Sequence, residues 1–198
     1  MDLVLIRHPL PAIDAGICYG KTDVPLAGLA TQSATMLAAR LATLGAPLPR
    51  HFVTSPLQRC AHLAEALAKH FDCTAGLDPR LQEIDFGEWE GQPWAAIDRA
   101  ALGAWAADLR HARMHGGESV AQFEARVGAW LDSWRTRMVE PGASVLAVTH
   151  AGVMRMAASL ALGEPIDAVL KWPLEMAAIV WLRREPGGGA WRLLHWNA

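Results

Sequence analysis

Two short, mainly apolar runs in this chain end at a histidine. Residues 3–6 are followed by Arg7 and His8, and residues 144–149 are followed by His150. A continuous apolar run of this length is typical of a strand that is covered on both faces of a parallel sheet, and ligands of such sheets bind beyond the carboxyl ends of the strands. The two runs predict buried strands that deliver polar side chains to one edge, although either run alone also fits a strand that ends in surface residues.

Helical and strand-like patterns alternate along the rest of the chain. Apolar residues recur at helical spacing over residues 26–44, 94–109 and 119–138, and a further helix is expected over residues 151–162. In the first of these helices the apolar positions are Leu29, Met36, Leu37, Leu41 and Leu44. Residues 81–91 carry carboxylates and glycines with little periodicity, which predicts an extended segment and loop.

The remaining strand signals are short. Residues 51–54 are predicted as a strand, after which Ser55 and Pro56 are expected to cap and begin a helix that runs to about residue 70. Residues 177–184 and 190–195 flank a Pro-Gly-Gly-Gly sequence and predict a terminal hairpin. Apart from that hairpin, strands alternate with helices, so we expect a three-layer α/β/α sandwich with a mainly parallel sheet.

Composition restricts the classes of function. The chain of 198 residues is 52% hydrophobic and is expected to form a single domain over residues 1–198. Its formal net charge of −2 gives no electrostatic case for binding nucleic acid or an anionic membrane. The three cysteines lack metal-ligand spacing, and no stretch approaches the roughly 18 apolar residues of a spanning helix, so we expect a cytoplasmic protein. Neither a G-x-G-x-x-G nor a P-loop pattern is present.

The polar residues after the predicted strands point to phosphoryl chemistry. Arg7, His8 and His150 follow strands, and Arg59 lies in the first turn of a predicted helix. Guanidinium groups are forks of donors that match phosphate oxygens, and a neutral histidine can attack phosphorus. A metal site is disfavoured because a cationic pocket repels a cation. Glu83 and Asp85 add carboxylates nearby.

Five motifs occur in a fixed order: Arg-His at 7–8, Ser-Pro-Leu-Gln-Arg at 55–59, Glu-Ile-Asp-Phe-Gly-Glu-Trp-Glu-Gly at 83–91, Gly-Gly-Glu-Ser at 116–119 and Thr-His-Ala-Gly at 149–152. With these motifs the chain resembles the histidine phosphatases of the phosphoglycerate mutase superfamily. The resemblance implies a phosphoglycerate mutase-like fold, hydrolysis of a small-molecule phosphomonoester through a phosphohistidine, and no metal or cofactor.

The resemblance also assigns roles to residues. His8 is expected to be the nucleophile, and Arg7, Arg59 and His150 are expected to bind the phosphoryl oxygens. Glu83 is the expected acid and base. From chemistry alone the neighbouring carboxylates Asp85, Glu88 and Glu90 remain alternatives to Glu83.

The loop after His8 gives a narrower resemblance. Residues 16–26 are similar to those of alpha-ribazole phosphatases, which act in the synthesis of the cobalamin lower ligand, and this implies that Tyr19, Gly20, Lys21 and Thr22 bind substrate. The alternatives are a phosphoglycerate mutase, a broad-specificity phosphatase and a non-catalytic phosphoryl-binding module. The oligomeric state is open, with a homodimer as one alternative.

Pro9 departs from the family pattern, which has glycine after the histidine. Proline lacks a backbone N–H and biases His8 toward an extended conformation, so either a backbone donor to the phosphate is missing here or the nucleophile is held more rigidly. We expect activity to survive because the other pocket residues are in place.

Overall fold

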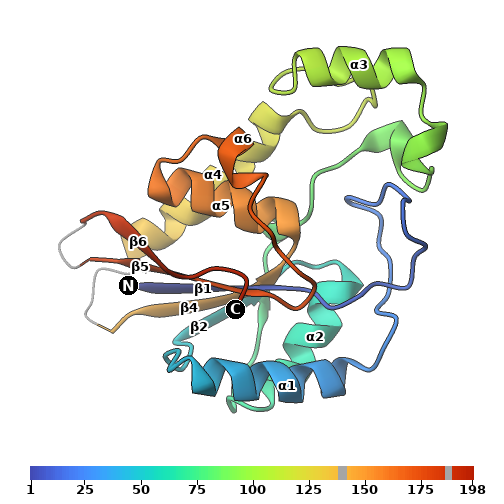
Figure 1. The fold of residues 1–198 in the computed structure, drawn as a ribbon. Coiled ribbons are helices and arrows are strands. Elements are labelled where there is room, and N and C mark those ends of the chain that lie inside the picture. The colour runs from blue at the N-terminus through green and yellow to red at the C-terminus, as the bar shows by residue number, and fades with distance from the viewer. Residues whose placement is uncertain (138–141, 186–188) are drawn as a thin grey trace.

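A mixed, mainly parallel sheet forms the centre of the molecule (Figure 1). The computed structural model describes residues 1–137, 142–185 and 189–198. The strands are β1 (Asp2–Arg7), β2 (His51–Thr54), β3 (Gly76–Leu77), β4 (Ser144–Thr149), β5 (Ile179–Arg184) and β6 (Trp191–His195). Their order in the sheet is β3-β2-β4-β1-β5-β6. The pairs among β1, β2, β3 and β4 are parallel, whereas β5 and β6 are antiparallel additions at one edge.

Helices cover both faces of this sheet, as Figure 1 shows. On one face lie α1 (Ala30–Thr43) and α2 (Gln58–Ala68), and on the other lie α4 (Val120–Arg137), α5 (Ala151–Leu162) and the short α6 (Ile166–Val169). Alternate side chains of β1 point to opposite faces: Leu3 and Leu5 pack in the α4 and α5 layer, and Val4 and Ile6 pack in the α1 and α2 layer. The predicted three-layer α/β/α sandwich is confirmed.

A smaller apolar cluster lies outside these two layers. It is built from Cys18, Trp89 and Ile97, with Trp94 and Trp105 packed against them. The chain reaches it through three 3-10 turns (Pro79–Leu81, Gly87–Trp89 and Trp94–Ala96) and through α3 (Arg99–Ala107). Figure 1 shows α3 apart from the sheet. The predicted loop over 81–91 therefore contains short helical turns.

The prediction of one helix over 94–109 is wrong. The backbone turns extended at Ile97, and the Asp98 carboxylate accepts a hydrogen bond from the Ala101 N–H at 3.0 Å, which starts a new helix there. No residue of α3 is buried. The regular spacing of apolar residues in this segment thus reflects two short elements that share one cluster.

Two further predictions, which concern α1 and α2, are wrong. Leu29 and Met36 are 64% and 60% exposed, because the buried face of α1 is formed by Ala34, Leu37 and Leu41 instead. The second helix starts at Gln58, three residues after Ser55, and no side chain of its own N-cap residue bonds to it.

The other helices and strands are close to their predicted ranges. In α4 the residues Phe123, Val127, Trp130, Leu131 and Trp134 are buried as predicted, whereas Met138 lies outside the described residues. The pairing of β5 with β6 confirms the terminal hairpin, of which residues 186–188 lie outside the described part. In the described ranges, no helix has the length and apolar character needed to cross a membrane.

Candidate active site

The pairing of β1 with β4 brings the two predicted site histidines together. Arg7 is in register with Thr149, so both strands end at the same edge of the sheet. The His8 N–H donates to the Thr149 carbonyl at 3.0 Å, and the His8 and His150 rings lie 5.2 Å apart with an angle of 62° between their planes. His8 is 2% exposed and His150 is fully buried. The parallel register thus creates the histidine pair.

The His8 ring is held with one nitrogen free. Its Nδ1 lies 2.7 Å from the carbonyl oxygen of Pro9. A carbonyl oxygen only accepts hydrogen bonds, so Nδ1 carries the proton and Nε2 carries the lone pair. Burial, with smaller contributions from Arg59 and Arg7, lowers the pKa of His8 to about 3 despite this hydrogen bond. His8 is therefore a neutral imidazole with a nucleophilic Nε2. Pro9 has no N–H to donate, but its carbonyl oxygen orients the His8 ring.

Two guanidinium groups keep unused donors beside the histidines. The buried Arg59 donates to the carbonyls of Gly20 and Thr22 at 2.6 Å each, and its Nε has no partner in the described part of the chain. Arg7 donates to the Leu174 carbonyl, and its buried Nε likewise has no partner among the described residues. Buried donors of this kind fit an anionic ligand, because an unpaired buried N–H costs free energy.

His150 is fixed by a residue that sequence reasoning had assigned elsewhere. Its Nε2 and the Ser55 hydroxyl are hydrogen-bonded at 2.8 Å, and the Cys60 sulfur lies 3.5 Å from the same nitrogen. Burial, followed by the charge of Arg59, lowers the pKa of His150 well below its ordinary value. Ser55 was predicted as a helix cap. The cap of α2 comes instead from the loop, where the Asp23 carboxylate accepts from the Gln58 N–H at 2.7 Å.

Glu83 is attached to the start of α5, directly after His150. Its Oε2 accepts from the Gly152 N–H at 2.9 Å, and its Oε1 accepts from the Ile84 N–H at 3.1 Å. A Cβ on residue 152 would lie 2.2 Å from the Glu83 Oε1, so only glycine leaves room for this carboxylate. The glycine of the Thr-His-Ala-Gly motif thereby sets the position of Glu83.

The neighbouring carboxylates have other partners. Asp85 accepts from the Gly87 N–H at 2.8 Å and pairs with Lys21 at 3.4 Å, and Glu88 is exposed. Glu90 is occupied by loop donors. Of the four carboxylates, Glu83 is the one that bonds to the segment directly after His150 among the described residues, and it stays the predicted acid.

Glu90 organises the loop that follows His8. Its carboxylate accepts from five groups, which are the backbone N–H groups of Gly20, Lys21, Thr22 and Phe86 at 2.9–3.1 Å and the Thr22 hydroxyl. The carbonyls of Gly20 and Thr22 in turn hold Arg59. These two residues thus contact Glu90 and Arg59 in the structure, and their predicted contact with substrate stays a prediction.

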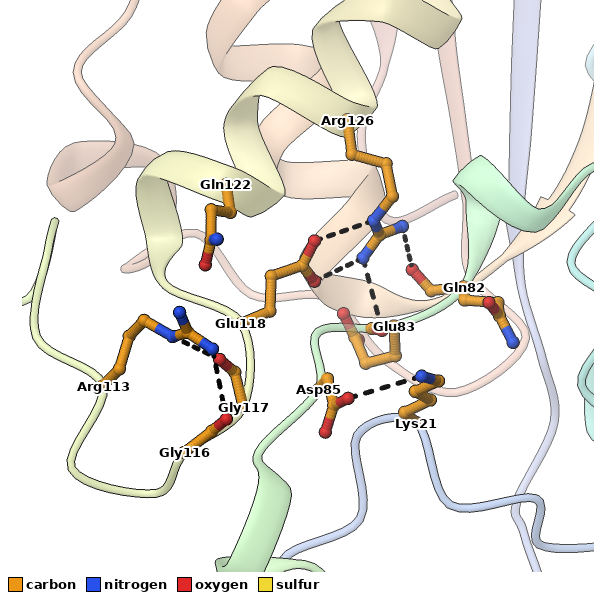
Figure 2. A pocket seen from close by; sticks show the side chains of 10 residues that line it. All are labelled: Lys21, Gln82, Glu83, Asp85, Arg113, Gly116, Gly117, Glu118, Gln122 and Arg126. Atoms are coloured by element: carbon orange, nitrogen blue, oxygen red, sulfur yellow. Dashed lines mark hydrogen bonds and ion pairs between the residues drawn. The ribbon is translucent and has the colours of Figure 1, made fainter.

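Two cavities meet at Glu83. The aromatic cavity, of about 320 Å³, is mainly apolar and is lined by Tyr19, Phe86, Trp94, Trp105 and Phe123 together with Glu83 and Arg155. The polar cavity, of about 370 Å³, is lined by Lys21, Gln82, Glu83, Asp85, Arg113, Gly116, Gly117, Glu118, Gln122 and Arg126 (Figure 2). Both cavities border the expected position of the leaving group, because Glu83 belongs to both walls.

Arg155 was missed by the sequence analysis. It lies one turn after Gly152 on α5, and its buried Nε has no partner in the described ranges, while Nη2 donates to the Trp172 carbonyl at 3.1 Å. Burial, followed by the charge of Arg7, lowers its pKa. The sequence signal that could have found Arg155 is its position one helical turn after Gly152 of the Thr-His-Ala-Gly motif.

A family model described as the histidine phosphatase superfamily (branch 1) matches residues 3–198. The chain belongs to the histidine phosphatase superfamily. This histidine phosphatase is 31% identical to a glucosyl-3-phosphoglycerate phosphatase of Mycolicibacterium vanbaalenii, over 99% of this chain and 94% of that protein. It is 27% identical to an adenosylcobalamin/alpha-ribazole phosphatase of Escherichia coli, over 85% of this chain and 83% of that protein.

The fold is also found among solved structures. The native structure of a mycobacterial glucosyl-3-phosphoglycerate phosphatase matches all of this chain and 98% of that chain with a TM-score of 0.84 and 28% identity. The histidine phosphatase described here is therefore a phosphoric monoester hydrolase, as its sequence predicted.

Proposed function

We propose that this histidine phosphatase hydrolyses its substrate through a phosphohistidine formed at the Nε2 of His8. The observation that carries the proposal is the contact of His8 Nδ1 with the Pro9 carbonyl, which leaves Nε2 unprotonated beside His150. Arg7 and Arg59 hold unpaired donors at the same place. A phosphoryl group bound by these donors is exposed to attack from His8.

The proposed reaction has two steps. In the first, Nε2 of His8 bonds to phosphorus, the bond from phosphorus to the ester oxygen breaks, and Glu83 gives its proton to that oxygen. In the second, Glu83 takes a proton from water, the water oxygen bonds to phosphorus, and the bond from phosphorus to Nε2 breaks. Inorganic phosphate leaves and both side chains return to their starting states. The cations balance the negative charge in both transition states.

For the substrate we propose alpha-ribazole 5'-phosphate. The aromatic cavity beside Glu83 suits a flat, largely apolar heterocycle, because rings stack on Tyr19, Trp94 and Trp105. The similarity of residues 16–26 to alpha-ribazole phosphatases and the name of the E. coli relative support the same proposal, and we propose a cytoplasmic location for the enzyme.

Glucosyl-3-phosphoglycerate is the second candidate. Arg155 on the wall of the aromatic cavity has no carboxylate partner among the described residues, and a glycerate carboxylate in the leaving group would supply one. The M. vanbaalenii relative, at 31% identity, is named for this activity.

A substrate screen combined with trapping of the intermediate tests the proposal. We expect the wild type to release phosphate fastest from alpha-ribazole 5'-phosphate and to carry acid-labile label from a ³²P-labelled substrate. His8→Ala should lose at least about 10⁴-fold in kcat and all of the label. His62→Ala, a change at an exposed histidine of α2, is the matched control and should retain both. Label that persists in His8→Ala contradicts the assignment.

A further inference from the structure

We propose that the polar cavity binds hydroxyl groups of the leaving group, so that the preferred substrate carries hydroxyls close to its ester oxygen, as a sugar does. The proposal rests on the assignment of Glu83 as the acid at that oxygen. Because Glu83 belongs to the walls of both cavities, a leaving group bound at its carboxylate can extend into each of them. In this proposal the aromatic cavity binds the ring of the leaving group, and the polar cavity binds its hydroxyl groups.

Four of the six charged side chains on the wall of the polar cavity form two ion pairs with each other (Figure 2). Arg126 forms a two-point ion pair with Glu118 at 2.6 and 2.9 Å, and Lys21 pairs with Asp85 at 3.4 Å. Arg113 donates to the carbonyl of Gly117 at 2.6 Å. Because most charges of this wall are already satisfied by one another, the wall offers limited attraction to an ionic ligand, which favours an uncharged polar one.

Two amides of the wall keep hydrogen-bonding capacity. The Gln82 side chain makes no hydrogen bond with any residue that the structure describes. The Gln122 Oε1 accepts from the Ser119 N–H at 2.9 Å, and this leaves its NH₂ group to donate. An amide provides both donors and an acceptor, and a hydroxyl also donates and accepts, so the two groups are complementary.

The backbone beneath the cavity is held firmly. Arg126 donates to the carbonyls of Arg80 and Gln82 at 2.8 Å each, and the Glu118 N–H donates to the Asp85 carbonyl at 2.8 Å. A change confined to the end of the Gln82 side chain therefore leaves these main-chain bonds in place. Gln82 is the residue whose substitution tests the proposal most directly.

The experiment compares Gln82→Leu with the wild type on three substrates. These are alpha-ribazole 5'-phosphate, its 2',3'-dideoxy analogue and 1-naphthyl phosphate, which lacks hydroxyls. We expect Gln82→Leu to lower kcat/KM for alpha-ribazole 5'-phosphate by about three- to tenfold and to leave the other two within about twofold, since one neutral hydrogen bond is lost. The wild type should reject the dideoxy analogue by a similar factor. Gln82→Asn should recover part of the loss.

Glucosyl-3-phosphoglycerate and 3-phosphoglycerate form a second pair, in which the former carries the several hydroxyls of the sugar and the latter a single hydroxyl, so Gln82→Leu should lower kcat/KM more for the former. If alpha-ribazole 5'-phosphate proves no better than naphthyl phosphate, the proposed substrate is wrong, and the second pair then decides the role of the cavity by the same comparison. Equal losses on 1-naphthyl phosphate and the hydroxyl-bearing substrates would show that Gln82 only supports Glu83. No loss on any hydroxyl-bearing substrate would show that the cavity holds no part of the leaving group. Either result overturns the inference.

Discussion

The proposed phosphate side of the site and its proposed leaving-group side are built from different kinds of structure. Arg7 is the last residue of β1, His8 and His150 directly follow β1 and β4, and Arg59 lies in the first turn of α2. The two cavities draw many of their residues from the segment 81–123, which contains 3-10 turns, α3 and the small cluster around Trp89.

We expect the side chains held by the sheet to determine the chemistry and those on the short turns to determine the choice of substrate. Side chains placed by a buried sheet have little freedom, because register and packing determine where each strand ends. Side chains on short turns depend on a few local contacts and tolerate exchange more easily. Damage to the phosphate side should therefore affect every phosphomonoester alike, whereas damage to the leaving-group side should affect substrates selectively.

After His8→Ala, the variant with the largest expected effect is Gly152→Ala, which tests the leaving-group side. The added methyl group displaces Glu83, so kcat/KM, which covers only the steps up to formation of the phosphohistidine, should fall by about 100-fold for alkyl phosphates, within the usual contribution of a general acid. The fall should be smaller for p-nitrophenyl phosphate, whose leaving oxygen needs no proton. Steady-state kinetics on both esters measure this.

Gly128→Ala is the matched control for that variant. A Cβ at this position in α4 meets only the Leu160 side chain, at an ordinary 3.6 Å, and activity should not change. Equal losses on alkyl and nitrophenyl esters in Gly152→Ala would argue against Glu83 as the acid.

The next effect concerns Glu90→Gln. The loop it holds also supplies the carbonyls that orient Arg59, so the affinity for vanadate and kcat/KM for all substrates should fall on the order of 10- to 100-fold. Glu88→Gln, at an exposed position nearby, should change neither quantity. A loss in Glu90→Gln that is confined to one substrate would place Glu90 on the leaving-group side instead.

A smaller and selective effect is expected for Trp105→Leu. Loss of part of the aromatic wall should lower kcat/KM roughly five- to tenfold for naphthyl phosphate and alpha-ribazole 5'-phosphate, and should leave glycerol 3-phosphate unchanged. A uniform loss across all three esters would mean that the small cluster supports the whole site and does not select substrates.

The smallest effect is on stability. It tests the buried, neutral state of His8 on the phosphate side through the pH dependence of unfolding. Because the pKa of His8 is about 3 in the folded protein and near 6.5 when unfolded, the unfolded chain alone takes up this proton between those values. The free energy of unfolding should therefore fall as pH falls below 6.5, by roughly 2 kcal/mol from pH 7 to pH 5 for this group. Urea unfolding should show a weaker pH dependence in His8→Asn. The same dependence in both proteins would rule out a buried neutral His8.

The sequence was most informative where the sheet determines position. The apolar runs before His8 and His150 predicted both strands, and their parallel orientation was expected from the alternation of strands and helices. Arg59 was predicted near the site for the wrong local reason, because Ser55 bonds to His150 and Asp23 caps the helix from 35 residues away. Contacts between distant segments leave no local periodicity.

The leaving-group side was less predictable for the same reason. The break at Ile97 depends on a single capping carboxylate, and the segment keeps an unbroken apolar pattern across it. The role of Glu90 depends on a loop 70 residues earlier in the chain. Only the family resemblance separated Glu83 from its neighbours in the sequence, because its contact with Gly152 is a close approach that no spacing reveals.

The hydrogen bonds from the loop after His8 to the Glu90 carboxylate, here called the Glu90 clamp, have a consequence for the evolution of this enzyme. Nearly all of its contacts run through main-chain groups, so at position 21 the clamp fixes the path of the chain without using the side chain of Lys21. That side chain lies on the wall of the polar cavity. If Lys21 and Arg59 have the proposed roles, a lineage can exchange residue 21 for a new substrate while Arg59 stays aligned, and selection for a different substrate need not reduce the catalytic rate.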